Sequence, residues 1–192
     1  SGFKPEQYEY NFRIDTKICQ DSYARGLAGR EAFGRVSEDK DEHRIRCSFP
    51  NLREYNWEGD VSPGISYQDM ILYKVHVRGY TRQAKVAPKK RGTFAGLKEM
   101  IPYWKELGIN AVELMPAYEF MERSIVEPGK AMIRQKHHKD KVNYWGYLPG
   151  FYFAPKSAYC ATKKPHKEFC DMVRAFHEAG IECIMEMYFP AD

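Results

Sequence analysis

The chain has 192 residues, the size of one ordinary domain and enough to bury a sizeable core. It carries 30 lysines and arginines against 26 aspartates and glutamates, and the formal charge of +4 is too small to indicate nucleic acid or an anionic membrane as a partner. No apolar run approaches the ~18 residues that a membrane-spanning helix needs. The first five residues lack the apolar core of a signal peptide.

The number and spacing of the cysteines indicate the redox compartment of the protein. The five cysteines are odd in number and widely spaced, and no Cys-x-x-Cys occurs, which weighs against a disulfide framework and a structural zinc site. Cys170 and Cys183 lie on apolar faces and are expected to be small core residues. We therefore expect a reducing, cytoplasmic location.

Residues 1–68 show little regular periodicity. They are rich in charge, Tyr, Asn and Gly, and Pro63-Gly64 marks a turn. We predict a mostly irregular lead-in to a domain that begins at residue 69.

Two predicted strands with a helix between them come next. Residues 70–77 are β-branched and aromatic, which predicts a buried strand. Thr93 can cap a helix that we expect to bend at Pro102 and to end at Gly108. The buried face of this helix is predicted to comprise Leu97, Met100, Ile101, Trp104 and Leu107. Residues 109–115 then predict a second buried strand.

The same order recurs towards the end of the chain. Pro165 suits a first helical turn, and Gly180 suits the end of that helix. The apolar stripe of this helix comprises Phe169, Met172, Val173 and Phe176. Residues 181–189 predict a third buried strand. Strands that alternate with amphipathic helices indicate βαβ units, a parallel sheet and the α/β class.

Residues 117–142, between the second and third predicted strands, are polar and basic and predict a long loop. The loop contains His137 and His138. Adjacent histidines without a patterned third ligand weigh against a metal site, so a solvated loop is the preferred interpretation.

Residues 143–153, which follow the loop, hold six aromatic residues in eleven positions. Flat side chains can cover the apolar C–H faces of sugar rings at low entropic cost, so such a cluster suits carbohydrate. Core packing beneath a loop is the alternative, and the cluster alone favours it.

The aromatic run also carries a family resemblance. Residues 143–147, Asn-Tyr-Trp-Gly-Tyr, resemble a segment of the pullulanase, isoamylase and glycogen-debranching branch of the alpha-amylase superfamily. Further segments resemble that family in the same order: residues 21–30, 57–69, 71–81, 91–97, 107–116 and 153–159. Any one motif is weak, but the ordered set covers residues 15–190.

The resemblance implies an eight-stranded (β/α)8 barrel with its site at the carboxyl ends of the strands. Residues 69–192 would supply the first three β/α units, and residues 1–68 would follow a missing N-terminal β-sandwich. The family's catalytic Asp nucleophile, Glu acid/base and second Asp come from later strands, so we expect this chain alone to be inactive. Three parallel strands leave unpaired edges, so its expected partner is the remainder of its own polypeptide.

The activity implied is cleavage of α-glucosidic bonds in glycogen, starch or branched maltodextrins, with α-1,6 debranching by a retaining mechanism favoured. An α-glucan oligosaccharide or polysaccharide is the expected ligand. The alternative is a non-catalytic carbohydrate-binding protein on the same scaffold. No cofactor is expected: calcium occurs in the family, but nothing in this chain supports it.

Three residues are candidates for substrate binding on this resemblance. Tyr147 matches a tyrosine that stacks on the sugar at the cleavage subsite. Trp145 matches a position that lines the same subsite, with a buried wall residue as the alternative. Asn143 would bind sugar or fix the loop backbone, and the second role is preferred.

Charged residues on the predicted strands are expected to be structural. An inward-facing His76 suits a satisfied core group, and Arg78 suits an ion pair. Glu113 and Glu186 would be buried carboxylates in need of partners. Glu186 matches a family Asp that is largely structural, so direct catalysis by it is not expected.

The sequence departs from the family pattern in two places. Lys74 stands where an acidic residue is common. Pro190-Ala191 replaces an Asn-His pair whose histidine touches the sugar and whose asparagine often supports calcium. Both of those roles are in doubt for this chain.

Overall fold

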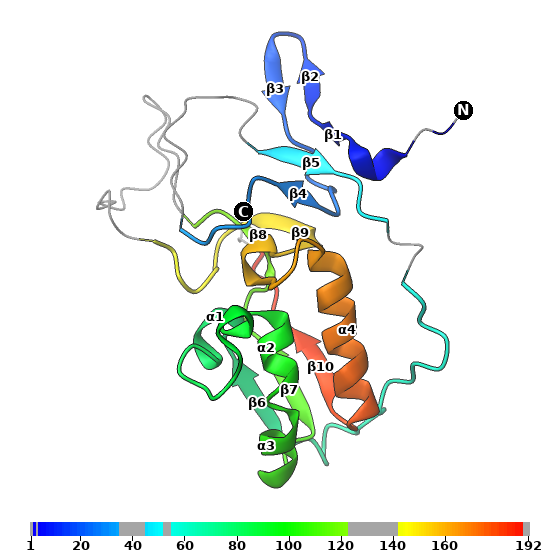
Figure 1. Cartoon of the computed structure of the whole chain (residues 1–192), viewed down its shortest axis with the longest axis vertical. Helices are drawn as coiled ribbons and strands as arrows, with labels where there is room; N and C mark the ends of the chain where they lie inside the picture. The colour runs from blue at the N-terminus through cyan, green and yellow to red at the C-terminus, as the bar shows by residue number, and fades with distance from the viewer. Residues whose placement is uncertain (1, 3, 35–44, 52–54, 123–141, 190–192) are drawn as a thin grey trace.

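The computed structural model describes residues 2, 4–34, 45–51, 55–122 and 142–189. Small antiparallel sheets formed by the N-terminal segments lie at one end, and a parallel sheet with its helices lies at the other (Figure 1). A further antiparallel pair, β8 and β9, lies between them. No helix in the described ranges is long and apolar enough to cross a membrane.

The parallel sheet contains β6 (Leu72–Val75), β7 (Ala111–Leu114) and β10 (Glu182–Met185), in the order β10-β7-β6. Both neighbouring pairs are parallel, and each connection contains at least one helix, which confirms the predicted βαβ units; the second connection also contains β8 (Tyr118–Phe120) and β9 (Gly150–Pro155). Each strand is shorter than predicted. At the first strand the reason is local, because His76 caps a helical turn, α1 (Val77–Tyr80), where the prediction continued the strand to residue 77.

The predicted capping and stop residues act as expected. Thr93 Oγ1 accepts a hydrogen bond from Gly96 N at the start of α2 (Phe94–Lys98), and Gly108 and Gly180 end helices at φ 75° and 70°. Pro102 lies in the first turn of a separate helix, α3 (Ile101–Glu106), so the predicted bend is a break. Helix α4 (Pro165–Glu178) starts at its proline, as predicted.

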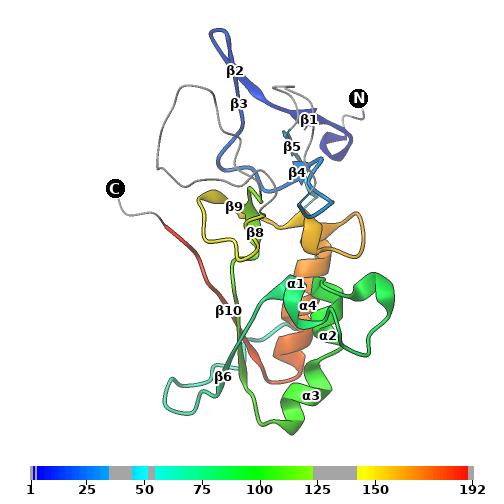
Figure 2. The same cartoon turned by 90° about the vertical axis from the view of Figure 1, so that its left-hand side faces the viewer.

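The helices cover one face of the parallel sheet (Figure 2). Between them lies an apolar core whose buried members include Val75, Val77, Phe94, Leu97, Trp104, Val112, Leu114, Met172, Phe176 and Ile181. Trp104 Nε1 donates to the Tyr80 hydroxyl at 2.8 Å, so the largest side chain of this core also has its polar atom satisfied. Leu107 is exposed, which corrects its predicted place on the buried stripe: the helix ends at Glu106.

The first 68 residues contain more structure than predicted. Strands β1 (Glu9–Tyr10), β4 (Leu27–Ala28) and β5 (Arg46–Ser48) form one antiparallel sheet, and β2 (Phe12–Ile14) and β3 (Lys17–Cys19) form a hairpin. Strands of two or three residues are too short to show a period of two, which explains why they were missed. The division of the chain at residue 68 stays a prediction.

The predicted loop 117–142 is wrong at its start. Tyr118–Phe120 form β8, which is wholly buried and pairs antiparallel with β9 (Gly150–Pro155). Because all three residues of β8 are buried, the segment lacks the alternation of a half-exposed strand, and its partner is thirty residues away. The basic segment with His137 and His138 lies outside the described residues.

Short 3-10 turns complete the described elements: η1 (Pro5–Gln7), η3 (Pro88–Lys90) and η4 (Ser157–Tyr159). The sheet of β1, β5 and β4 packs against the β8–β9 pair through a small second core. Its buried members are Ala24, Leu27, Ile45 and Cys47, with Met121 and Phe151 packed against them.

Candidate functional site

The turn at 143–147 is held in place by backbone contacts from the end of β8. Asn143 N donates to the Glu122 carbonyl at 2.7 Å, and Asn143 Oδ1 accepts from Gly146 N at 3.1 Å. Gly146 has φ 85°, and a Cβ there would lie 2.5 Å from the Phe120 ring, so only glycine fits. These bonds give Asn143 the loop-fixing role that was preferred. A contact between Asn143 and sugar stays a prediction.

Trp145 projects from this turn and is 54% exposed. Its ring meets His76 edge to face at 5.5 Å between centroids, and meets Tyr144 edge to face at 5.3 Å. In this chain the ring is therefore anchored by two neighbours and still accessible, and its role in the subsite stays a prediction.

Tyr147 is 37% exposed and is tied to the end of the parallel sheet. Its hydroxyl donates to Glu186 Oε2 at 3.0 Å, and its ring meets Tyr188 edge to face at 6.3 Å. Partial burial and the Glu186 carboxylate both raise the pKa of Tyr147, so the hydroxyl keeps its proton at neutral pH. Tyr147 therefore presents a ring whose hydroxyl has a fixed partner.

Glu186 and Glu113, the two acidic strand residues singled out from the sequence, share one cation. Lys74 Nζ lies 2.8 Å from Glu186 Oε2 and 3.3 Å from Glu113 Oε1. The hydrogen bond to Glu186 is the main reason that the pKa of Lys74 is raised. Both carboxylates thus have the expected partner, but the prediction that they are buried is wrong, because their side chains are 20% and 24% exposed. Sequence reasoning noticed Lys74 only as a departure and missed its pairing.

His76 is buried and fully bonded, as predicted. Its Nδ1 accepts from Gly79 N at 2.9 Å, so Nε2 carries the proton and faces the Tyr144 carbonyl at 2.8 Å. Burial lowers the pKa of His76, which favours this neutral form. Arg78 lies with Cζ 4.4 Å from the centre of the Phe33 ring; the expected ion pair is not found with any carboxylate of the described ranges.

A cluster of four charges, three of them buried and the fourth, Arg30, partly buried, supports the turn from behind. Lys156 Nζ lies 2.6 Å from Glu122 Oε1 and 3.4 Å from Glu119 Oε2, and Arg30 Nη2 lies 2.5 Å from Glu122 Oε2. Ser157 N also donates to Glu119 Oε1 at 2.5 Å. The two carboxylates and two cations balance, which such deep burial requires. Sequence analysis missed this cluster, because its members are spread from residue 30 to residue 156.

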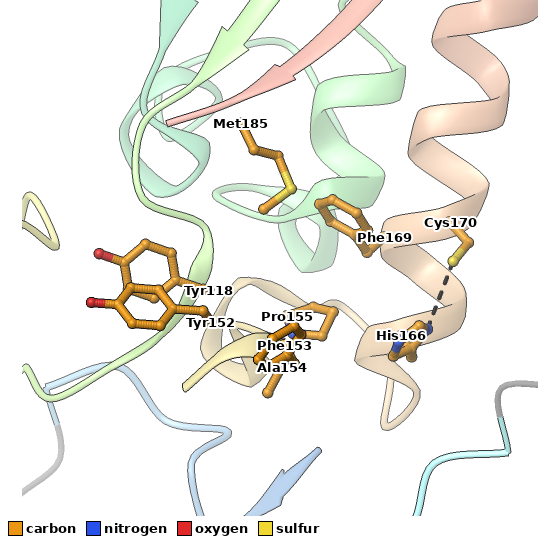
Figure 3. Close-up of a pocket in the computed structure, with 9 residues that line it drawn as sticks. All are labelled: Tyr118, Tyr152, Phe153, Ala154, Pro155, His166, Phe169, Cys170 and Met185. Carbon is orange, nitrogen blue, oxygen red and sulfur yellow. Dashed lines mark hydrogen bonds between the residues drawn. The ribbon is translucent and has the colours of Figure 1, made fainter. Parts of the chain in front are cut away.

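A separate cavity of about 170 Å³ lies between β9, the start of α4 and Met185 of β10 (Figure 3). Its lining is mostly apolar, and it includes neither Tyr147 nor Trp145. Cys170 Sγ lies 3.7 Å from His166 Nδ1 at its edge, but burial raises the pKa of Cys170 to about 11. The thiol is therefore protonated at neutral pH and unsuited to nucleophilic catalysis.

Potential metal ligands are scattered over the part of the chain that the structure describes. Among those residues, no group of three or more His, Cys, Asp and Glu side chains is arranged to bind a metal ion. The departure at Pro190-Ala191, which bears on calcium and on a sugar contact, lies outside the described residues.

Known proteins are similar in sequence to this chain over nearly its whole length. No family model matches it. It is 32% identical over 193 residues to chloroplastic isoamylase 1 of Arabidopsis thaliana, covering 96% of this chain and 24% of that protein. It is 34% identical over 199 residues to a glycogen operon protein GlgX homolog of Haemophilus influenzae, covering 94% of this chain and 29% of that protein. The chain matches the pullulanase/isoamylase type of alpha-amylase-family glycoside hydrolase.

A solved structure supports the fold of this pullulanase/isoamylase-type chain. The Group B Streptococcus pullulanase SAP, in complex with maltotetraose, superposes with a TM-score of 0.63 at 23% identity. The superposition covers 94% of this chain and 24% of that structure. The chain thus spans roughly a quarter of the length of these three relatives.

Proposed function

We propose that this pullulanase/isoamylase-type chain contributes to a retaining hydrolase that cleaves α-1,6 bonds in glycogen, starch or branched maltodextrins. In this proposal β6, β7 and β10 are the first three strands of a (β/α)8 barrel, with α2–α3 and α4 as the connecting helices. The names of the relatives, isoamylase, pullulanase and a glycogen operon protein, support the substrate class.

The observation that carries the proposal is the position of Tyr147. Its hydroxyl is bonded to Glu186, the first residue after β10, so the tyrosine lies at the carboxyl end of a parallel strand. Barrel enzymes place their substrate sites at this end of the sheet. The 143–147 turn thus presents two accessible rings, Tyr147 and Trp145, where such a site would lie.

The two rings suit a glucan. An aromatic face covers the C–H face of a pyranose ring, and fixed rings lose little entropy on binding. Trp145 is held by His76 and Tyr144, and Tyr147 by Glu186 and Tyr188. We propose that they form part of the subsite wall and that an α-glucan oligosaccharide stacks on them.

The hydrolytic step is assigned elsewhere in the polypeptide. Retaining hydrolysis needs a nucleophilic carboxylate and a protonated carboxylic acid about 5–5.5 Å apart. Glu113 of β7 and Glu186, which follows β10, both pair with Lys74 beside Tyr147. They are suited to hold Lys74 and Tyr147 in place, not to protonate a leaving group.

The test is release of reducing sugar from pullulan and glycogen by the full-length protein and by its Tyr147→Ala variant. We expect hydrolysis by the parent protein and a loss of about five- to twelvefold in kcat/KM in the variant, because a stacking interaction of ~1–1.5 kcal/mol is removed. A parent protein that binds these glucans without cleaving them would instead support the non-catalytic carbohydrate-binding alternative.

A further inference from the structure

Lys74 forms ion pairs with two other elements of the parallel sheet. Its side chain is 42% exposed, and ion pairs of such exposed lysines contribute little to folding. The residue nevertheless contacts carboxylates from two other elements, Glu113 of β7 and Glu186 after β10.

The register of the sheet brings Lys74, Glu113 and Glu186 together. Lys74 lies directly opposite Glu113 in the β6–β7 pair, and Glu113 lies opposite Ile184 in the β7–β10 pair. Residues two apart on a strand share a face, so Glu186 points to the same side as Ile184. Three charged side chains thus converge on the sheet face away from the helices, at the end where Tyr147 lies.

One carboxylate oxygen of Glu186 contacts both Lys74 and Tyr147, the candidate sugar-stacking residue. Glu186 Oε2 accepts from the Tyr147 hydroxyl at 3.0 Å and lies 2.8 Å from Lys74 Nζ. Without the lysine, the carboxylates of Glu113 and Glu186 would share this face with no cation between them. Like charges repel, so the Glu186 carboxylate would turn away from Glu113, and this movement would weaken its hydrogen bond to Tyr147.

We propose that Lys74 is a positioning residue for glucan binding: it fixes the Glu186 carboxylate, which in turn fixes the Tyr147 ring. The inference rests on the proposed function of Tyr147 as a sugar platform and names a positioning residue for it. An acidic residue at position 74, which is common in the resembling family, would instead add a third carboxylate. In this chain the positive charge of Lys74 instead attracts the Glu186 carboxylate, which in turn orients Tyr147.

The experiment is a double-mutant cycle in the full-length protein, with maltotetraose as the probe and the dissociation constant as the readout. Lys74→Met should weaken binding by about three- to tenfold in the parent protein and have no further effect in a Tyr147→Phe background. Lys74→Arg, which keeps the charge, should recover most of the affinity. Lys167→Met, which removes another exposed lysine, paired with Asp171 on α4, should leave binding unchanged.

The outcomes separate the two proposals. An equal loss with and without the Tyr147 hydroxyl, or no loss at all, would overturn the positioning role while leaving the glucan platform intact. A parent protein that does not bind maltotetraose would overturn the platform and the positioning role together. If Lys74→Met fails to fold, Glu186→Gln takes its place, since it removes the charge that Lys74 holds and should show the same dependence on the Tyr147 hydroxyl.

Discussion

The helical half of the molecule and the β8–β9 half solve the problem of burial differently. Beneath α2, α3 and α4 the core is largely apolar, with Trp104, Met172 and Phe176 fully buried, and the one buried carboxylate described there, Glu168, accepts from the backbone N–H of Ala95. Behind the 143–147 turn the interior holds Glu119, Glu122 and Lys156 at 3% exposure or less. The apolar half gains from area removed from water, whereas the charged half is stable only while every ion keeps its partner. Small changes should therefore be tolerated in the first and not in the second.

The largest effect is expected from Lys156→Met, a change of similar size and shape. It leaves two buried carboxylates with Arg30 as their remaining cation, so the free energy of unfolding should fall by about 3–5 kcal/mol. Urea denaturation followed by tryptophan fluorescence would measure it. Lys167→Met is the matched control, because its exposed pair with Asp171 should cost less than about 1 kcal/mol. Equal losses of unfolding free energy in Lys156→Met and Lys167→Met would show that the buried ion cluster contributes no more than an exposed ion pair.

A smaller effect is expected at the turn that carries the candidate rings. Gly146→Ala combines φ 85° with a Cβ 2.5 Å from Phe120, and should cost about 1–3 kcal/mol and weaken maltotetraose binding. Gly108 has a similar φ of 75° but open space around a Cβ. Gly108→Ala should therefore carry the backbone cost alone, about 1–2 kcal/mol, with unchanged affinity. The same loss of affinity in both variants would show that the turn geometry does not matter.

Met172→Leu tests whether the apolar core beneath α2, α3 and α4 tolerates a small change. The side chain is fully buried in the apolar core, and the substitution nearly conserves volume, so the loss should stay below about 1.5 kcal/mol. Comparison of its urea midpoint with that of Lys156→Met places two near-isosteric changes side by side. A loss at Met172 as large as that at Lys156 would show that the two halves do not differ in tolerance.

The smallest effect concerns pH. Burial lowers the pKa of His76, so the unfolded chain binds a proton more readily than the folded one once the pH falls below about 6.5. Stability should then decline on acidification, by at most about 1.4 kcal/mol per pH unit for this group, until the folded pKa is reached. His76→Gln should flatten the part of the stability–pH curve below pH 6.5. His166 contributes in the same direction, so the slope should decrease without vanishing.

Those elements that rest on local signals could be predicted from the sequence. The cap at Thr93, the proline at the start of α4 and the glycine stops at 108 and 180 act through neighbours within a few residues. The alternation of strands and helices then gave the βαβ units. The aromatic turn was found because its residues are consecutive, and the family resemblance gave Tyr147 its expected role.

The features that were missed depend on contacts between distant segments. Strand β8 is visible only through its pairing with β9, and the buried charges of Arg30, Glu122 and Lys156 meet only in three dimensions. Lys74 belongs to the same group: its departure from the family pattern was evident, but its two carboxylate partners follow from the register of the folded sheet. A single sequence contains the residues of such clusters without indicating that they meet.

The most direct test of the glucan platform is a crystal structure of the full-length protein with maltotetraose. The account predicts a glucose ring stacked on Tyr147, with Trp145 beside it and the Tyr147–Glu186–Lys74 contacts retained. A sugar bound instead in the apolar cavity between β9 and α4, or away from the 143–147 turn altogether, would contradict it.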